Sequence, residues 1–470
     1  MGPPGTGKTR TLIGLVQQHL HDNPSNAALF CSHTKSAAQT AVGRWAGSLD
    51  RLEICTIHSM AFGALRLSRA QTVDEARLGE FSKQFGMDMD DGGDAKAYLE
   101  IIDRARATDQ SMRVAYQVSQ RPGTADHFMA FATSYFKWKK QFGYVDFSDM
   151  LMLYCERVKV PSRYTLMVVD EAQDLTLQHW RVVEHFMDLN PKCQIIVAGD
   201  DDQCIYSHAG AVALGADQFA KLHDAEVTIL GQSYRVPRAV HALASRIVAR
   251  IDDRVAKTYL PRDFEGKVQN WGEFQWGHSV GRADRDTIVL YADKFVRRDD
   301  VEPALMDAGV PFTALSGFPA PLDTQVGRAI RLAHQGPFNQ RPFSDDERRV
   351  LRRGLSDKGR TVLDVVGVDA LCERLRKLDT SLVGKIHWSH LDYFKRVDFR
   401  KPINVKISTI HGAKGGEAQD VHLICGQSPS AIDQSLLDPD SKHRLFYVGV
   451  TRASERLFLY GGDNAYEMPR

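Results

Sequence analysis

The chain has 470 residues, too many for a single hydrophobic core, so we expect two to four domains. The hydrophobic and charged fractions, 43% and 25%, are typical of a soluble globular chain, and no apolar stretch reaches the length of a membrane span. The formal net charge of +1 excludes a protein that attracts polyanions through its overall field, so any nucleic-acid contact requires local basic grooves. Seven scattered cysteines without a C-x-x-C pair indicate neither a zinc site nor a disulfide framework, and they fit a reducing compartment.

The strongest motif is the start of the chain. Residues 2–9 follow the pattern G-x-x-x-x-G-K-[ST], which is typical of the phosphate-binding loop of nucleotide hydrolases. Glycines let backbone N–H groups surround phosphate oxygens, Lys8 supplies a charge for the β- and γ-phosphates, and the Thr9 hydroxyl suits Mg²⁺. We expect a helix through Thr11–Val16, whose dipole adds to the anion site. The alternative is a glycine-rich turn that matches by accident. The nucleotide-binding positions of the loop are Gly2, Pro3, Pro4, Gly5, Thr6, Gly7, Lys8 and Thr9.

Strand and helix patterns alternate after this loop. Residues 27–31 form a short apolar run with strand character, residues 36–45 read as a helix, and residues 53–57 are strand-like again. This order predicts a parallel sheet with crossover helices.

From about Leu65 to Gly143 the chain is polar, helical in pattern and poor in strand signals, which predicts a helical insertion. It closes with aromatics interleaved with lysines at Tyr135–Lys140. Such a segment can stack bases and hold phosphates. It can equally be an amphipathic helix with core aromatics and solvated lysines, and we favour this second interpretation.

Two acidic motifs follow apolar strands. Leu166–Val169 predicts a buried strand, and Asp170 and Glu171 stand at its carboxyl end, where open α/β sheets bind ligands. An Asp there can hold Mg²⁺ through water, and the adjacent Glu can polarise the attacking water. The strand predicted at residues 194–198 is followed by three acids and Gln203, whose amide can sense a γ-phosphate by hydrogen bonding.

A second α/β region begins at Thr287–Tyr291, and residues 405–409 and 457–460 read as further strands. Between about Gln325 and Arg400 lies another polar, helical segment. Its charged run at residues 345–353 is read as a solvated helix face, with a DNA-facing role as the alternative. Two α/β regions in one chain suggest a duplicated motor core.

Seven motifs occur along the chain, in the order Gly2–Thr9, Thr56–Ser59, Val169–Asp174, Gly199–Tyr206, Ser233–Arg235, His411–Gly415 and Tyr447–Ala453. With these motifs in this order, the chain resembles a superfamily 1 DNA helicase of the UvrD/Rep type. The resemblance implies an α/β fold with two RecA-like P-loop NTPase motor domains, helical accessory insertions, and ATP in the cleft between the motor domains. The implied boundaries are 1–65 and 146–232 for the first motor domain, 66–145 for its insertion, 233–324 and 401–470 for the second motor domain, and 325–400 for a reduced second insertion.

The resemblance also implies roles in ATP hydrolysis, with Mg²⁺ as cofactor. Lys8, Thr9, Asp170 and Glu171 perform the phosphate, metal and water chemistry, and Gln203 reports the γ-phosphate. Arg235 and Arg452 act as arginine fingers, because a planar guanidinium fits transition-state oxygens well. Arg10 and Tyr234 match the positions that sandwich the adenine, and Glu417 matches a ribose contact.

The implied track is single-stranded DNA, with 3′ to 5′ movement and tailed duplex as a further partner. The DNA-binding positions are Thr56, His58, Tyr206, His208 and His411. His208 and Ala209 depart from the family, which has an aromatic and an arginine there, and the second insertion is shorter than usual. By analogy we expect a role in DNA repair or replication in the cytoplasm of a bacterial or phage-infected cell, with no membrane partner.

The largest departure is at the start, because the family has an apolar strand and a glutamine motif before the loop. We therefore expect a truncated or mis-started version of a longer protein, with a rearranged sheet as the alternative. The expected function is an ATP-dependent DNA helicase or translocase. The rivals are a translocase that does not unwind duplex and a catalytically impaired DNA-binding module, impaired because that strand is absent.

Overall fold

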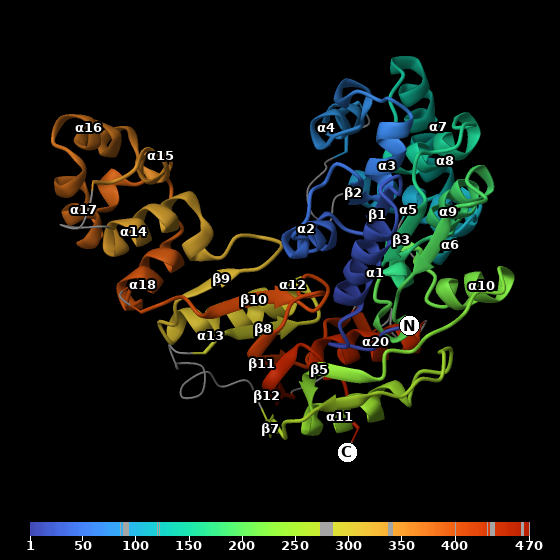
Figure 1. Cartoon of the computed structure of the whole chain (residues 1–470). Coiled ribbons are helices and arrows are strands. Elements are labelled where there is room, and N and C mark those ends of the chain that lie inside the picture. Colours follow the sequence, from blue (N-terminus) through green and yellow to red (C-terminus); the bar gives the residue numbers. More distant parts are fainter. Residues whose placement is uncertain are drawn as a thin grey trace. The chain divides into compact units, whose positions relative to one another are not determined.

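A computed structural model describes residues 1–84, 86–87, 94–119, 121, 123–272, 285–336, 342–399, 401–429, 431–432, 438–461 and 465–469. The chain forms two compact units, the first of residues 1–234 and 252–260, the second of residues 235–251 and 261–470. Each unit holds a parallel sheet flanked by helices (Figure 1). The predicted α/β fold class is therefore confirmed. Within the described residues, no helix combines the length and apolar character that a membrane crossing requires.

The sheet of the first unit has four parallel strands in the order β2-β1-β3-β4. The strands are β1 (Ala28–Ser32), β2 (Leu52–Thr56), β3 (Leu166–Asp170) and β4 (Gln194–Val197). Register places Ser32 opposite both Thr56 and Asp170, so three neighbouring strands end in one row. The polar motifs that follow these strands therefore meet at one edge of the sheet.

Alternation along the strands builds a core on each face of this sheet. On one face Phe30 and Val168 pack with Leu12 and Val16 of α1 (Lys8–Asp22), beside α2 (Lys35–Arg44). On the other face Val169 belongs to a core with residues of four more helices. These helices are α3 (Ile57–Ala64), α8 (Phe147–Arg157), α9 (Leu177–Leu189) and α10 (Gly215–Leu222).

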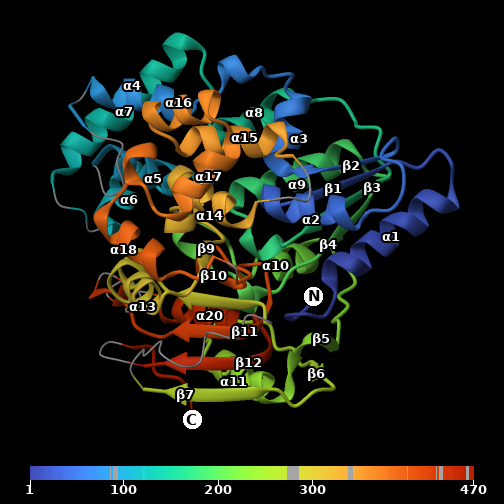
Figure 2. The same ribbon diagram turned by 90° about the vertical axis from the view of Figure 1, so that its left-hand side faces the viewer.

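The predicted first insertion is helical and has its own aromatic core. Its helices are α4 (Glu75–Lys83), α5 (Asp94–Ala107), α6 (Met112–Val118) and α7 (Ala125–Phe142), and Figure 2 shows them gathered together. Phe81, Phe131 and Tyr135 are buried in this core, so the amphipathic interpretation of the segment 135–140 is confirmed for its aromatics. The expectation that the lysines of this segment are solvated is wrong for Lys139, which is 4% exposed.

Lys139 is buried because it belongs to an ion cluster that joins the insertion to α8. Its Nζ atom lies 2.6 Å from Asp149 Oδ2 and also contacts Asp146. Arg106 contacts the same two carboxylates at 2.9 and 2.6 Å. A buried charge is tolerated only when it is paired in this way.

The sheet of the second unit has six parallel strands in the order β7-β12-β11-β8-β10-β9. The strands are β7 (Lys267–Trp271), β8 (Thr287–Tyr291), β9 (Phe312–Ala314), β10 (Val405–Thr409), β11 (Ala418–Ile424) and β12 (Ala453–Tyr460). The central strand β8 is buried throughout. The flanking helices are α11 (Arg238–Val248), α12 (Lys294–Val296), α13 (Glu302–Asp307) and α20 (Pro439–Val450), and a separate two-stranded sheet joins β5 (Gln232–Pro237) to β6 (Leu260–Arg262).

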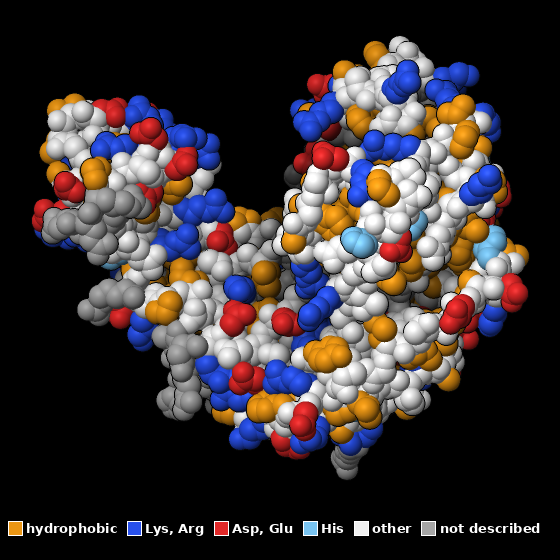
Figure 3. Space-filling model, viewed as in Figure 1, with side chains coloured by type: hydrophobic (Ala, Val, Ile, Leu, Met, Phe, Trp, Pro, Cys, Tyr) orange, Lys and Arg blue, Asp and Glu red, His pale blue; other side chains and the backbone are white. Residues whose placement is uncertain are grey.

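The segment predicted as the second insertion is also helical. It contains α14 (Gln325–Gln335), α15 (Asp345–Gly354), α16 (Asp357–Val365), α17 (Val368–Arg376) and α18 (Trp388–Arg396). Leu351 of α15 is buried, whereas Arg349, Arg352 and Arg353 are exposed. Acidic and basic side chains intermingle over α15 to α17 in Figure 3, as expected of a solvated helix face.

Candidate functional site

The phosphate-binding pattern forms a tight loop that leads into α1. Gly5 and Gly7 have φ angles of 72° and 81°, a region that favours glycine, and Gly7 caps the helix. The Lys8 Nζ atom donates to the carbonyl of Gly2 at 2.6 Å. A Cβ atom on Gly2 would lie 2.1 Å from Cγ of Lys8, so only glycine fits beside this side chain.

The loop meets the end of β3 through a hydroxyl–carboxylate contact. Thr9 Oγ1 donates to Asp170 Oδ2 at 2.8 Å. Asp170 is 2% exposed, and burial together with the nearby charge of Glu171 raises its pKa to about 6. A hydroxyl and a carboxylate at this distance are a suitable pair of oxygen ligands for Mg²⁺, which keeps several waters and binds through one or two carboxylates plus phosphate oxygens. The residues present therefore fit the metal that the motif implies.

Glu171 stands directly after β3 in a left-handed conformation, with φ 56° and ψ 41°. This conformation is uncommon for a residue with a side chain, and it turns the backbone sharply at the strand end. The Gln173 Nε2 atom donates to Glu171 Oε2 at 2.6 Å, and Gln173 Oε1 accepts from the backbone N–H of Asp200 at 3.0 Å. Gln173 thus joins the two acidic motifs.

The second acidic motif is buried. Asp200, Asp201, Asp202 and Gln203 are all less than 7% exposed, and the Gln203 Nε2 atom donates to Asp200 Oδ2 at 2.5 Å. The backbone N–H of Gly2 donates to the carbonyl of Gly199 at 3.0 Å, which ties this motif to the phosphate loop. Gln203 and the loop therefore belong to one site in the first unit.

Two cations that the sequence does not single out neutralise these acids. Lys257 Nζ lies 3.2, 2.5 and 2.8 Å from carboxylate oxygens of Asp200, Asp201 and Asp202. Arg254 makes a bidentate contact with Asp202 at 2.8 and 2.7 Å. Although burial opposes its charge, the three carboxylates raise the pKa of Lys257 above its ordinary value. No motif marks either residue, so only the three-dimensional structure reveals them.

The expected adenine positions lie beside the loop. The backbone N–H of Tyr234 donates to the carbonyl of Gly5 at 2.8 Å, and Ser233 Oγ donates to the carbonyl of Pro4 at 2.8 Å. The Tyr234 side chain is 71% exposed, and Arg10, near the start of α1, is exposed as well. Both side chains are accessible to a base.

Four of the expected DNA contacts lie beside the same sheet. Thr56 caps α3, and the His58 ring packs edge-on against His179, with ring centroids 4.9 Å apart. Burial lowers the pKa of His58 to about 4, so the imidazole is neutral at pH 7. The rings of Tyr206 and His208 have centroids 6.1 Å apart.

The remaining expected residues lie together in the second unit. Arg235 and Glu417 form an ion pair at 3.5 Å. Arg452 is 1% exposed and donates to the carbonyls of Val448 and Gly416 at 3.0 and 3.2 Å. His411 begins the loop that leads from β10 towards Glu417.

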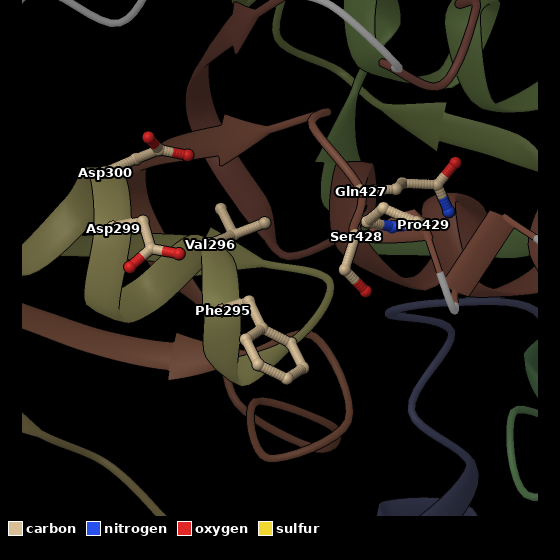
Figure 4. Close-up of a pocket in the computed structure, with 7 residues that line it drawn as sticks. All are labelled: Phe295, Val296, Asp299, Asp300, Gln427, Ser428 and Pro429. Atoms are coloured by element: carbon tan, nitrogen blue, oxygen red, sulfur yellow. The ribbon is translucent and has the colours of Figure 1, made fainter.

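A cavity of 450 Å³ elsewhere in the second unit is lined by none of the expected site residues (Figure 4). Its lining is Phe295, Val296, Asp299, Asp300, Gln427, Ser428 and Pro429. The two carboxylates make it unsuited to a phosphate group.

Two family models match the chain. The model of the UvrD/REP helicase N-terminal domain matches residues 1–224, and that of the UvrD-like helicase C-terminal domain matches residues 385–461. The ATP-dependent DNA helicase UvrD2 of Mycobacterium tuberculosis is 24% identical over 532 residues, covering 97% of this chain and 75% of the relative. DNA helicase II of Haemophilus influenzae is 26% identical over 203 residues, covering 37% of this chain and 27% of the relative. The ATP-dependent DNA helicase PcrA of Bacillus subtilis is 24% identical over 196 residues, covering 37% of this chain and 26% of the relative.

Both halves of the fold and the motif order agree with these matches, so the chain belongs to the UvrD/Rep-like helicases. This is a class of ATP-hydrolysing enzymes that act on DNA, with repair and replication as typical roles. The resemblance stated from the motifs is confirmed.

Proposed function

We propose that this protein is an ATP-driven motor that moves along single-stranded DNA in the 3′ to 5′ direction and unwinds tailed duplex. The observation that carries the proposal is the arrangement at one sheet edge. Thr9 of the loop contacts Asp170 directly, and hydrogen bonds through Gln173 and Asp200 link Glu171 to Gln203. Phosphoryl transfer needs positioning and charge stabilisation more than covalent chemistry, and these groups supply both.

Each group has a proposed part in hydrolysis. Backbone N–H groups of Gly5, Gly7 and Lys8 and the Lys8 ammonium bind the phosphates, while Thr9 and Asp170 would hold Mg²⁺. The Glu171 carboxylate orients the attacking water and accepts its proton as the water oxygen bonds to the γ-phosphorus and the bond to the β-phosphate oxygen breaks. The Gln203 amide reports whether the γ-phosphate is present.

The second unit contributes Arg235 and Arg452 as proposed arginine fingers, and Glu417 as a ribose contact. Arg10 and Tyr234 hold the adenine. Because such fingers act only when they reach the transferred phosphate, hydrolysis becomes coupled to domain movement, and alternating grips on DNA follow from that coupling. The domain boundaries 1–65, 66–145, 146–232, 233–324, 325–400 and 401–470 remain our proposed division of the motor and its insertions.

We further propose that Thr56, His58, Tyr206, His208 and His411 contact the DNA strand. Imidazole and phenol rings can stack on bases of any sequence, which suits a motor that must pass over every base. By analogy with the bacterial helicases that the chain resembles, we also propose that it acts in the cytoplasm of a bacterial or phage-infected cell.

ATP hydrolysis with and without single-stranded DNA tests the proposal, using the parent chain, Lys8→Ala and Glu171→Gln. We expect DNA to stimulate the parent strongly and both variants to lose at least about a hundredfold in kcat. DNA binding without turnover in the parent contradicts the proposal and favours the silent binding module. If the parent hydrolyses ATP but does not separate the strands of a tailed duplex in a parallel unwinding assay, the result favours a translocase that does not unwind.

A further inference from the structure

The ammonium group of Lys257 is buried among three carboxylates. The side chain is 1% exposed, and Asp200, Asp201 and Asp202 surround its Nζ atom at 2.5–3.2 Å. Residues 252–260 belong to the first unit, although the chain on both sides belongs to the second. Close contacts hold residues 252–260 against the acidic motif. They are made by the side chains of Lys257 and Arg254 and by the Val255 N–H, which donates to Asp201 at 2.8 Å.

The cluster continues into the residues proposed for hydrolysis. One Asp200 oxygen faces Lys257, and the other accepts from Gln203 at 2.5 Å. The first of these oxygens accepts no hydrogen bond from the described residues, so Lys257 acts on it through the charge of the ion pair, which favours one direction of the Asp200 carboxylate. The direction of the Asp200 carboxylate in turn orients the Gln203 amide that donates to it.

A second branch leads to Glu171. The backbone N–H of Asp200 donates to Gln173 Oε1 at 3.0 Å, and Gln173 Nε2 donates to Glu171 Oε2 at 2.6 Å. Gly199 packs closely against the Gln173 side chain, because a Cβ atom on Gly199 would lie 2.8 Å from Gln173 Oε1. Displacement of the Asp200 carboxylate therefore changes the direction of Gln203, and displacement of the Asp200 backbone changes that of Gln173 and Glu171.

We propose that Lys257 is a positioning residue for ATP hydrolysis, acting through Asp200 on Gln203 and, by way of Gln173, on Glu171. The proposal rests on the function proposed above for Gln203 and Glu171. Lys257 needs no contact with the nucleotide, because it fixes the groups that make such contacts. Small misplacements of catalytic groups reduce rates strongly, so the effect belongs in kcat and not in nucleotide affinity.

The test compares the full-length parent with Lys257→Met, which keeps the length of the side chain and removes its charge. We expect kcat of DNA-stimulated ATP hydrolysis to fall about tenfold or more, while the affinity for a fluorescent ATP analogue changes less than about twofold. Lys257→Arg restores the charge and is expected to recover at least about a third of the parent kcat. Lys221→Met, which removes an exposed lysine paired with Asp217, is the matched control and is expected to match the parent.

Asp200→Ala provides an independent test from the other side of the contact. Lys257 keeps Asp201 and Asp202 as partners in this variant, so the segment 252–260 stays fastened. We expect the same fall in kcat, and the double variant Lys257→Met with Asp200→Ala falls no further than the more impaired single variant. If Lys257→Met does not fold, Asp200→Ala decides alone.

Two results overturn the proposal. One is an unchanged kcat in folded Lys257→Met or in Asp200→Ala. The other is a Lys257→Met variant that loses nucleotide affinity in proportion to kcat, which indicates general damage to the site. A parent chain without DNA-stimulated turnover, or an active Glu171→Gln variant, refutes the proposed function itself and is thereby distinguished from failure of the Lys257 proposal.

Discussion

At the scale of single residues, the phosphate loop depends on contacts that leave no room for ordinary side chains. The Gly2 carbonyl accepts a hydrogen bond from Lys8 Nζ, and the aliphatic part of the Lys8 side chain packs against the Gly2 α-carbon. The motif predicted this loop because its spacing alone defines it. The left-handed Glu171 and the bridging role of Gln173 could not be predicted, because neither backbone angle nor side-chain partner is encoded in a short pattern.

Gly2→Ala is expected to lower nucleotide affinity at least about tenfold, because its Cβ atom displaces the Lys8 side chain. Gly14→Ala is the matched control. A Cβ atom there meets nothing within 4 Å, and alanine favours the helix interior by about 0.5–1 kcal/mol. Titration with a fluorescent ATP analogue measures both, and equal affinity of the two variants contradicts the described packing of the loop.

His422 of β11 gives a prediction for stability against pH. Its ring stacks on Phe458, its Nδ1 atom lies 2.8 Å from the Tyr460 hydroxyl, and burial lowers its pKa to about 3. Below about pH 6.5 the imidazole is protonated in the unfolded chain but stays neutral in the folded chain. The free energy of unfolding therefore falls as the pH drops from about 6.5 towards 3.

His422→Asn removes this titration and is expected to reduce the slope of unfolding free energy against pH by up to about 1.4 kcal/mol per unit between pH 6 and 5. Urea unfolding at several pH values measures it. An identical slope in parent and variant shows that the imidazole does not stay neutral on folding.

At the scale of elements, short apolar runs predicted β1, β3, β4 and β8, because parallel strands are buried on both faces, whereas β7, β9 and β11 were not predicted. The strand at residues 166–169 was expected and ends one residue later, at Asp170. Charge patterns were a poorer guide to which side chains are buried. The lysines of α7 look alike in sequence, yet Lys139 is buried by an ion cluster whose other members come from α5 and α8, more than five residues away along the chain.

Lys139→Met is expected to destabilise the first unit by about 3–5 kcal/mol, because it leaves the buried carboxylate of Asp146 and the half-buried carboxylate of Asp149 with one cation fewer. Lys140→Met, at an exposed position of the same helix, is expected to change the free energy of unfolding by less than about 0.5 kcal/mol. Chemical denaturation measures the difference. Equal stability of the two variants contradicts the buried ion cluster.

At the scale of the whole molecule, the order of seven motifs predicted two α/β units because each motif follows a strand or opens a helix in the expected order. The sequence did not predict that residues 252–260 join the first unit. That segment is short and polar, and its place is set by the ion cluster at Lys257 and Arg254.

Arg235→Ala tests the contribution of the second unit to hydrolysis. The Arg235 side chain is 12% exposed and pairs with Glu417. As an arginine finger it is expected to contribute about a hundredfold or more to kcat, with little effect on nucleotide affinity. Arg238→Ala, in the following helix, removes a 51% exposed arginine and is expected to leave kcat unchanged. Equal turnover of the two variants argues against a finger at position 235.

The central claim is that hydrolysis drives movement along one DNA strand and separates the other. Its most direct test is ATP-dependent strand displacement from duplexes with a 3′ tail, a 5′ tail or no tail, with Glu171→Gln as the inactive control. We predict displacement from the 3′-tailed duplex by the parent chain and none from the 5′-tailed or blunt duplex. Rapid ATP hydrolysis without displacement from the 3′-tailed duplex contradicts the account, as does equal displacement from both tails.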